Sequence, residues 1–215
     1  CTGGVFSVTI TVNPKANIAD KTNTICSGTA FSIIPTNGGS EIVPVGTLYN
    51  WTVPNNTNLT GQSTVGTYTS TIGQTLNNLT NSQKQIIYTI TPISNNCIGG
   101  TFSATITVNP TPVIAAKSTP ICSGTAFVVT PSNNSPTEIV PSGITYTWSV
   151  VDNTNINGES GAVTPTSNTI SQTLTNTSNT PQLVSYTITP VAGVCTGVTF
   201  PINVTVNPLP IGTIT

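Results

Sequence analysis

The sequence predicts an all-β protein, and three observations support this fold class. Thr and Asn are very frequent, with 44 and 24 among 215 residues, and the chain also contains 18 Gly and 17 Pro. Thr favours strands, whereas Asn, Gly and Pro favour turns. Apolar residues alternate with polar ones in short segments, for example at Tyr49, Trp51 and Val53, as in strands that bury one face. The third observation is an internal repeat of about one hundred residues.

The repeat is visible in two pairs of identical words. ICSGTAF occupies residues 25–31 and again 121–127, a shift of 121 − 25 = 96. YTITP occupies residues 88–92 and again 186–190, a shift of 186 − 88 = 98. The two additional residues are expected to be loop insertions.

The segment at the start of the chain also belongs to this pattern. Residues 1–14 (CTGGVFSVTITVNP) match residues 97–110 (CIGGTFSATITVNP) at a shift of 96. We therefore expect the last strand of a preceding repeat at 1–14, full repeats at 15–110 and 111–208, and the start of a following repeat at 209–215. We also expect the full-length protein to hold further copies of about 97 residues on both sides.

The size and pattern of each repeat predict an immunoglobulin-like β-sandwich with Greek-key connections. In the first repeat we expect strands near residues 31–35, 48–53, 71–79, 85–92 and 101–108, with a short strand at 17–19 and a weak one within 58–69. Successive repeats are joined through Val-Asn-Pro with few residues between them, so the linkers are short and stiffened by proline. The array is expected to be a semi-rigid rod.

Four aromatic residues are candidates for the two cores. Trp51 and Trp148 stand in equivalent Tyr-x-Trp-x-Val segments, and Tyr88 and Tyr186 stand in the repeated YTITP word. An aromatic pair could stack on a sugar ring. We expect all four to be core residues, as the central Trp of an immunoglobulin domain is.

The composition excludes most catalytic chemistry. Only 4% of residues are charged and His is absent, so no triad that uses His can form. Glu41 and Glu138 occupy equivalent positions in separate repeats, which leaves no pair of carboxylates for acid–base catalysis. We expect no catalytic, cofactor-binding or metal site and no enzyme activity. The net charge of −1 provides no basic surface for nucleic acid or anionic lipid.

Two weaker patterns have ordinary explanations. Residues 153–158 (NTNING) resemble a calcium loop, but they lack an acid at the first position and Thr164 stands where a bidentate Glu is needed. A solvated turn is expected there. Lys21 with Glu41 is the Lys–acid combination that recurs, as Lys117 with Glu138. A buried Lys, Asn and acid together can form an intramolecular isopeptide bond in some surface-fibre domains, but solvated Lys and Glu side chains are the usual state.

The five cysteines indicate disulfides and an oxidising, extracellular setting. Each full repeat has one Cys before its second strand, Cys26 or Cys122, and one in the turn before its last strand, Cys97 or Cys195. Cys1 is expected to pair with a residue outside this sequence.

Two pairings are open for the other four cysteines. Bonds within each repeat, Cys26–Cys97 and Cys122–Cys195, would each contribute about 4 kcal/mol by chain entropy. Immunoglobulin topology, however, places those two turns at opposite ends of a sandwich, which favours a Cys26–Cys195 bond between repeats. We expect the pairing within repeats, on the assumption that residues 22–28 fold back along the sandwich.

Taken together, the words ICSGT, Tyr-x-Trp-Ser/Thr-Val, YTITP and TVNPxP resemble the tandem PKD-like and immunoglobulin-like repeats of very large cell-surface adhesins of gliding and other Bacteroidota. The resemblance implies export to the cell surface through type IX secretion and a role in adhesion or motility. The chain departs from antibody domains in lacking Cys two residues after Tyr88, where Ile90 stands.

The leading hypothesis is therefore a non-catalytic stalk or filament segment of an extracellular adhesin, which holds a distal binding region away from the cell. Its partners would be neighbouring repeats of the same chain, and other copies in a filament. A second hypothesis makes the repeats glycan- or protein-binding accessory modules of a secreted protein. A third makes the chain a fibre subunit that donates the apolar strand at residues 5–12 to a neighbour.

Overall fold

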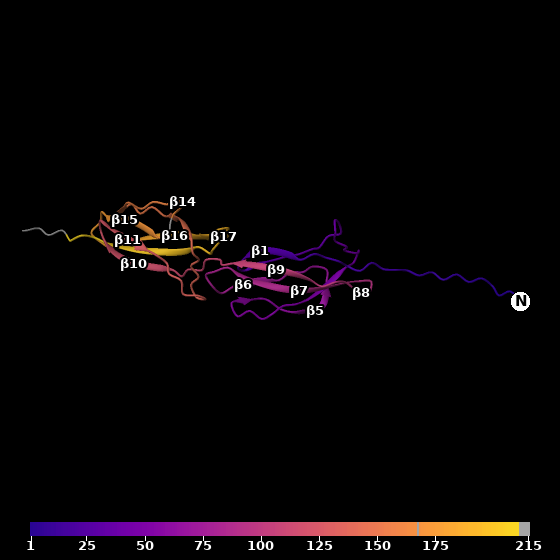
Figure 1. Ribbon diagram of the computed structural model, residues 1–215. Coiled ribbons are helices and arrows are strands. Elements are labelled where there is room, and N and C mark those ends of the chain that lie inside the picture. Colours follow the sequence, from indigo (N-terminus) through magenta and orange to yellow (C-terminus); the bar gives the residue numbers. More distant parts are fainter. Residues whose placement is uncertain (167, 211–215) are drawn as a thin grey trace, which may run out of the picture.

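The computed structural model describes residues 1–166 and 168–210. Over these residues the chain forms two β-sandwich domains placed end to end, preceded by an extended N-terminal segment (Figure 1). The described residues contain strands and turns but no helix. The start of a further repeat was expected at 209–215, of which 211–215 lie outside the described residues.

The first domain consists of nine strands. Their bounds are β1 (Lys21–Cys26), β2 (Thr29–Ala30), β3 (Leu48–Thr52), β4 (Leu59–Thr60), β5 (Val65–Thr69), β6 (Thr75–Asn78), β7 (Lys84–Ser94), β8 (Cys97–Ile98) and β9 (Phe102–Asn109). One sheet has the order β1-β9-β7-β3-β5 with β8 paired to β7, and the other has the order β2-β6-β4.

The second domain repeats this arrangement. Its strands are β10 (Lys117–Cys122), β11 (Thr125–Val129), β12 (Thr145–Val150), β13 (Ile156–Asn157), β14 (Ala162–Thr166), β15 (Ile170–Asn176), β16 (Gln182–Ala192), β17 (Cys195–Thr196) and β18 (Phe200–Asn207). The larger sheet has the order β10-β18-β16-β12-β14 with β17 paired to β16, and the smaller one β11-β15-β13. The predicted all-β tandem sandwich fold is confirmed.

The first strand of each domain, β1 or β10, was not predicted from the sequence. β1 pairs in parallel with β9 at the edge of the larger sheet, from Lys21 opposite Ala104 to Cys26 opposite Asn109. β10 pairs with β18 in the same way. The segment expected as the first strand, 17–19, makes only an isolated bridge between Asn17 and Ile42. This parallel edge strand fixes the position of Cys26.

Of the other expected strands, 48–53, 85–92 and 101–108 correspond to β3, β7 and β9 with ends shifted by at most two residues, and the rest differ more. The 58–69 segment divides into β4 and β5, the 71–79 strand is reduced to β6, and near 31–35 only the bridge between Ile33 and Ile72 is formed after β2. Proline has no N–H for a ladder, so Pro35 is a natural end to pairing in that last segment.

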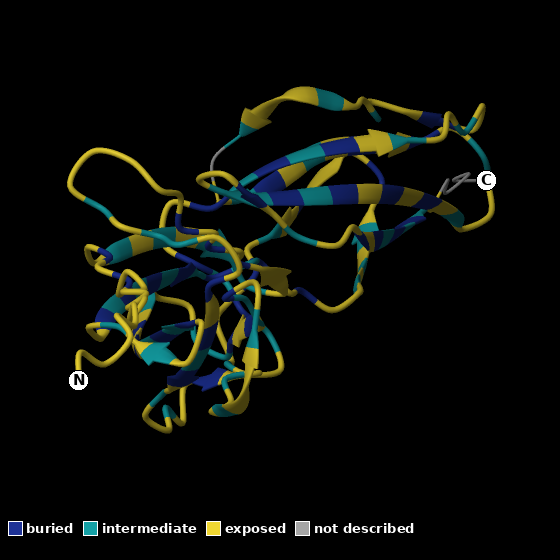
Figure 2. Ribbon diagram, turned by 90° about the vertical axis from the view of Figure 1, so that its right-hand side faces the viewer, coloured by how far each residue is buried: buried dark blue, intermediate teal, exposed yellow. Residues whose placement is uncertain are grey.

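The core of each domain lies between its two sheets, where the buried residues alternate with exposed ones along the strands (Figure 2). Tyr88 is fully buried, packs against Phe31 with ring centroids 5.2 Å apart, and donates a hydrogen bond to Gln74 Oε1 at 2.9 Å. Burial raises the pKa of the Tyr88 phenol to about 12. Tyr186 makes the same contacts with Phe127 and Gln172.

Both tryptophans lie in the cores with their ring N–H groups satisfied. Trp51 is 4% exposed and Trp148 is 9% exposed. Trp51 Nε1 donates to the Ser63 carbonyl at 3.0 Å, and Trp148 Nε1 donates to the Ser160 carbonyl at 2.9 Å. With their faces covered, these rings serve packing and offer no platform for a sugar.

A glycine after β4 permits close approach to β6. Gly61 has φ of +90°, and a Cβ there would overlap the Thr75 carbonyl oxygen. We expect Gly61→Ala to lower the free energy of unfolding of the first domain by about 3 kcal/mol, since backbone strain adds to the overlap. Gly46→Ala, at φ of +77° in open space, should cost only about 1 kcal/mol. Urea unfolding of the two variants checks this, and equal losses would contradict the close approach.

Candidate functional site

The repeated Lys–acid pairs form hydrogen-bonded ion pairs at the domain surface. Lys21 Nζ lies 2.5 Å from Glu41 Oε1, with side chains 27% and 16% exposed, and Lys117 Nζ lies 2.6 Å from Glu138 Oε1. Each glutamate also accepts a hydrogen bond from the backbone ahead of the first strand, from Ala19 N in the first domain at 2.9 Å. The pairs therefore tie the start of β1 and β10 to a neighbouring loop.

Because of these contacts, the stability of the fold depends on pH. The hydrogen bond from Lys21, with that from Ala19 N, holds the pKa of Glu41 below its ordinary value. A carboxyl whose pKa is lower in the folded state stabilises the fold above its unfolded pKa, and this contribution is lost as pH falls through the folded pKa.

We therefore expect Glu41→Gln to reduce stability near pH 7 but to have no effect once the carboxyl is protonated in both the folded and the unfolded state, at about pH 2. Thermal unfolding between about pH 2 and 7 measures the difference. The exposed Asp152→Asn variant serves as the control for a change of net charge. An equal loss at all pH values for Glu41→Gln would contradict the role of the ionised pair.

The segment that resembles a calcium loop is a hydrogen-bonded turn leading into β13. Asn153 Oδ1 accepts from Asn155 N at 3.1 Å, and Asn153 N donates to Glu159 Oε1 at 2.9 Å. Across residues 1–166 and 168–210, no group of three or more His, Cys, Asp or Glu side chains is placed to hold a metal ion. In the same part of the chain, no helix has the length and apolarity needed to cross a membrane.

The cysteines define the most specific feature of the structure, and they correct the expected pairing. Cys26 is bonded to Cys195, with Cα atoms 5.6 Å apart and a sequence separation of 169 residues. The expected bonds Cys26–Cys97 and Cys122–Cys195 are therefore wrong. In the described residues Cys1, Cys97 and Cys122 are free thiols.

The position of β1 explains this correction. Cys26 ends β1 opposite Asn109, the last residue of β9, whereas Cys97 pairs with Ser94 ahead of the start of β9. A strand of eight residues such as β9 is about 26 Å long, and a disulfide needs Cα atoms within about 7 Å. The two cysteines of one domain therefore lie at opposite ends of it (Figure 1).

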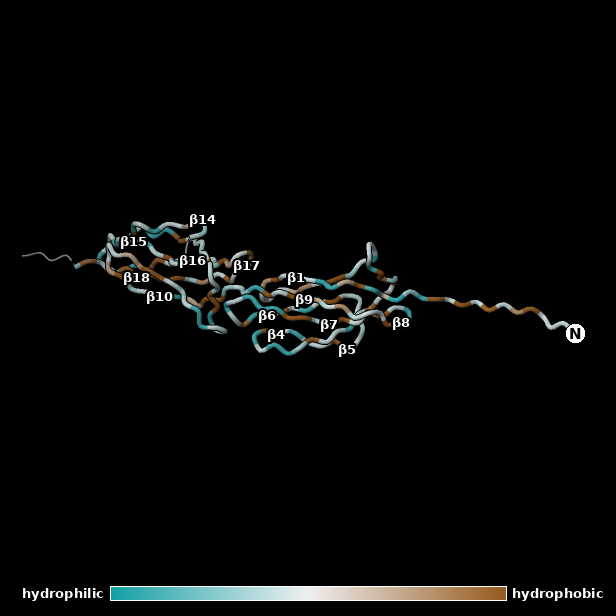
Figure 3. The backbone as a smooth tube through the Cα atoms, viewed as in Figure 1, coloured by the Kyte–Doolittle hydropathy of each residue, from teal (hydrophilic) through white to brown (hydrophobic). Residues whose placement is uncertain are grey.

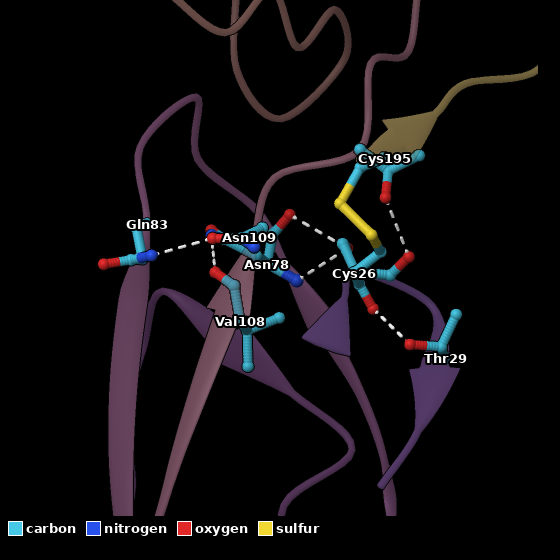
Figure 4. Close-up of a disulfide and its surroundings, with 9 residues drawn as sticks. Cys26, Thr29, Asn78, Gln83, Val108, Asn109 and Cys195 are labelled. Carbon is cyan, nitrogen blue, oxygen red and sulfur yellow. Dashed lines mark hydrogen bonds between the residues drawn. A yellow bond between two sulfur atoms is a disulfide. The ribbon is translucent and has the colours of Figure 1, made fainter. Parts of the chain in front are cut away.

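The bond crosses the joint between the domains. Cys195 begins β17, in the hairpin that pairs Ala192 with Cys195 and extends from the second domain toward the first. Cys195 is 1% exposed. Figure 4 shows the disulfide reaching from this hairpin to the end of β1, beside Asn78 and Asn109. The two domains are thus connected twice, by the polypeptide linker and by the disulfide.

Hydrogen bonds hold the first-domain side of the joint in place. Ser27 N donates to the Asn109 carbonyl at 2.8 Å, and Thr29 Oγ1 donates to the Cys26 carbonyl at 2.6 Å. In the linker, Thr111 Oγ1 donates to the Ser27 carbonyl at 3.0 Å. These bonds fix the turn after β1, so the Cys26 side chain faces the second domain from a defined position.

A shallow depression also spans the joint. It is lined from the first domain by Asn81, Ser82, Gln83, Asn109 and Pro110, and from the second by Pro141, Ser142, Ala192, Gly193 and Val194. The lining consists of amide, hydroxyl and small apolar groups without a charged side chain. This chemistry suits packing between domains.

The fold is that of two immunoglobulin-like sandwiches in tandem, with a disulfide across the joint between them. The profile of the PKD-like domain family matches residues 23–112 and 118–210. The chain therefore belongs to the PKD-like domain family, with two copies in tandem. Domains of these classes are generally non-catalytic, and with a disulfide they are typical of structural or binding modules of extracellular proteins.

The comparison with curated proteins gives no match. Among solved structures, the chain is similar to DIP-gamma IG1+IG2, with 9% identity, a TM-score of 0.35, and coverage of 90% of this chain and 95% of that one. It is also similar to three domains of mouse clustered PcdhgC3, with 13% identity, a TM-score of 0.36, and coverage of 92% and 68%. A pair of titin Ig tandem domains matches with 13% identity, a TM-score of 0.29, and coverage of 91% and 95%.

Proposed function

We propose that this chain is a structural stalk segment of an extracellular adhesin, in which tandem domains hold a distal binding region away from the cell surface. The observation that carries the proposal is the Cys26–Cys195 bond between the domains. Two domains that are connected only by a short linker usually move relative to each other. A second covalent connection restricts bending and twisting, as a spacer requires.

The distribution of repeated residues also supports a spacer. Many of the residues that recur between the domains belong to the cores, such as Trp51 with Trp148. The surface residues that recur include the ion-paired Lys21–Glu41 and Lys117–Glu138, whose side chains are occupied with each other. In the described residues, the exposed aromatic side chains are Phe6 and Tyr68. The counterpart of Tyr68 in the second domain is Pro165, because Thr69 and Thr166 occupy the same register opposite Tyr49 and Tyr146. A binding surface built on aromatic residues would be expected to recur.

The export route and cellular role in adhesion or gliding that accompany this proposal follow from the resemblance to Bacteroidota adhesin repeats. The neutral character of the chain, with a net charge of −1 and 4% charged residues, suits an inert extracellular spacer. It gives little electrostatic attraction for nucleic acid or lipid surfaces.

Small-angle X-ray scattering together with a binding screen tests the proposal. For the full chain we expect a narrow distribution of end-to-end lengths in oxidising buffer, a broader one after reduction, and no retention on glycan arrays or immobilised extracellular-matrix proteins. The exposed Thr57→Ala variant is the control. Binding that is lost in Tyr68→Ala and retained in Thr57→Ala would instead identify a binding module and overturn the spacer assignment.

A further inference from the structure

We propose that both outer ends of this two-domain unit dock a further PKD-like domain of the same polypeptide and form the same disulfide with it. Cys122 would bond to the cysteine equivalent to Cys195 in a following domain. Cys97 would bond to the cysteine equivalent to Cys26 in a preceding domain. This inference rests on the geometry of the observed joint and does not require the adhesin role.

The C-terminal end of the second domain reproduces the cysteine position of the joint. Cys122 ends β10 opposite Asn207, as Cys26 ends β1 opposite Asn109. The turn that follows has the same bonds, with Ser123 N donating to the Asn207 carbonyl at 2.8 Å and Thr125 Oγ1 to the Cys122 carbonyl at 2.6 Å. The exposed Cys122 thiol is therefore held where Cys26 meets its partner.

A depression at the same end shares two lining positions with the one that spans the joint. A depression of about 520 Å³ is lined by Thr177, Ser178, Asn179, Pro208, Leu209 and Pro210. Asn179 and Pro208 correspond to Asn81 and Pro110, which line the first-domain side of the joint. Two positions of the face that receives a domain at the joint are thus repeated, with the same residues, at the end of the second domain.

The N-terminal end of the first domain reproduces the opposite half. Cys97 pairs with Ser94 in the β7–β8 hairpin, as Cys195 pairs with Ala192 in the β16–β17 hairpin. Both hairpins continue with the same bond, from Gly99 N to the Pro92 carbonyl and from Gly197 N to the Pro190 carbonyl, each at 2.9 Å. The half-buried Cys97 is therefore placed at the end of its domain as Cys195 is.

Residues 1–14 indicate that the occupant of this end belongs to the same polypeptide. They match the sequence that contains β8 and β9 at a shift of 96, and hydrophobic and more polar residues alternate along this extended segment (Figure 3). Val5, Phe6, Val8, Ile10 and Val12 are 71–103% exposed. The equivalent strand β9 is covered on both edges, by β1 and β7.

A sheet with the same edges would cover this segment and supply the Cys26 equivalent. Asn13-Pro14 would then lead into Ala16 as Asn109-Pro110 leads into Pro112. A strand of this composition left unpaired would promote aggregation, which is a further reason to assign it to a preceding domain.

Bond formation needs an oxidant, and a small disulfide such as oxidised glutathione suffices. The two cysteine thiols form one S–S bond by successive exchange, and the small disulfide is reduced to two thiols, which take up the two protons. The reaction adds one covalent bond for each joint between domains.

A duplicated chain tests the proposal, with residues 1–208 followed directly by residues 15–215 and with Cys1→Ser. The new junction has the sequence Val-Asn-Pro-Lys-Ala, identical to residues 12–16. After refolding in a glutathione redox buffer, peptide mapping without reduction should find Cys122 of the first copy bonded to Cys97 of the second. A connected domain has an effective concentration in the millimolar range, so bonding should be nearly complete.

The Cys26–Cys195 bond within each copy reports correct folding. If both of these form while Cys122 and Cys97 across the junction remain alkylatable thiols, the proposal is overturned. Bonds between Cys97 and Cys122 of separate molecules, found as multimers without the bond inside the chain, would also overturn it. In the control with Cys97→Ser in the second copy, first-copy Cys122 should remain a free thiol.

Discussion

Replacing Cys26 and Cys195 together by serine is expected to lower the free energy of unfolding, summed over both domains, by about 5 kcal/mol. The two cysteines are 169 residues apart, so the bond closes a long loop in the unfolded chain and removes much of its entropy. Loop-closure entropy rises only with the logarithm of loop length, which places this bond slightly above the value for a loop of about one hundred residues.

Guanidinium chloride unfolding of the full chain measures this effect. The Cys97→Ser/Cys122→Ser variant has the same number of substitutions but keeps the bond between the domains, so its transition should be unchanged. A second readout is whether the two domains unfold in one transition or in two. Without the disulfide that connects them, each domain can unfold independently. Coincident curves for the two double variants would contradict a stabilising staple.

The sandwich fold was predictable because its signals are local and repeated. Alternation in Tyr49, Trp51 and Val53 and in β9 places one side of each strand in the core. The repeated words indicated the tandem organisation without any structural information. The same local signals identified Tyr88 and Trp51, whose large side chains are the ones that cores accommodate.

The pairing of the cysteines was not predictable in this way, because it depends on a strand with a weak pattern. β1 has the sequence KTNTIC, in which the alternate half-buried positions hold the polar Lys21 and Asn23 and the apolar Ile25, and only Ile25 packs against the core. Its partner in the sheet is β9, which comes much later in the chain, and the pairing is parallel. Without this strand the assumption that residues 22–28 fold back along the sandwich could not be rejected.

Two buried asparagines were also missed, since composition alone does not separate them from the other Asn residues, 24 in all. Asn78 is 1% exposed and Asn176 is 8% exposed. They occupy equivalent positions two residues after Leu76 and Leu174, which are both fully buried. The recurrence of Leu-x-Asn at the same place in the two repeats is the signal that could have identified them.

Asn78 joins the two sheets at the end of the domain that faces the joint. Its Nδ2 donates to the Ser82 carbonyl at 2.7 Å and to the Val108 carbonyl at 3.0 Å. Its Oδ1 accepts from Thr80 N at 2.9 Å, and its backbone N donates to Ser27 Oγ at 2.8 Å. These contacts connect β6, β9 and the turn beside Cys26 (Figure 4).

Asn78→Asp is therefore expected to lower the free energy of unfolding of the first domain by about 3 kcal/mol at pH 7. The substitution keeps the shape of the side chain but replaces the amide donor by an oxygen, so the Ser82 and Val108 carbonyls lose their partner inside the protein. It also buries a carboxylate beside two carbonyl oxygens, which disfavours the ionised form and raises the pKa of the new acid. Urea unfolding at pH 7 measures the loss, with the exposed Asn81→Asp as the matched control.

The pH dependence of this loss separates the hydrogen-bond argument from a simple packing defect. An acid whose pKa is higher in the folded than in the unfolded state destabilises the fold as pH rises above its unfolded value, and the penalty is smallest below that value. The carboxyl group that Asn78→Asp introduces can, once protonated, again donate to one of the two carbonyls. The difference between Asn78→Asp and the unsubstituted chain should therefore shrink as pH falls from 7 to about 3, and a loss that is the same at both pH values would contradict the assigned donor role of the Asn78 amide.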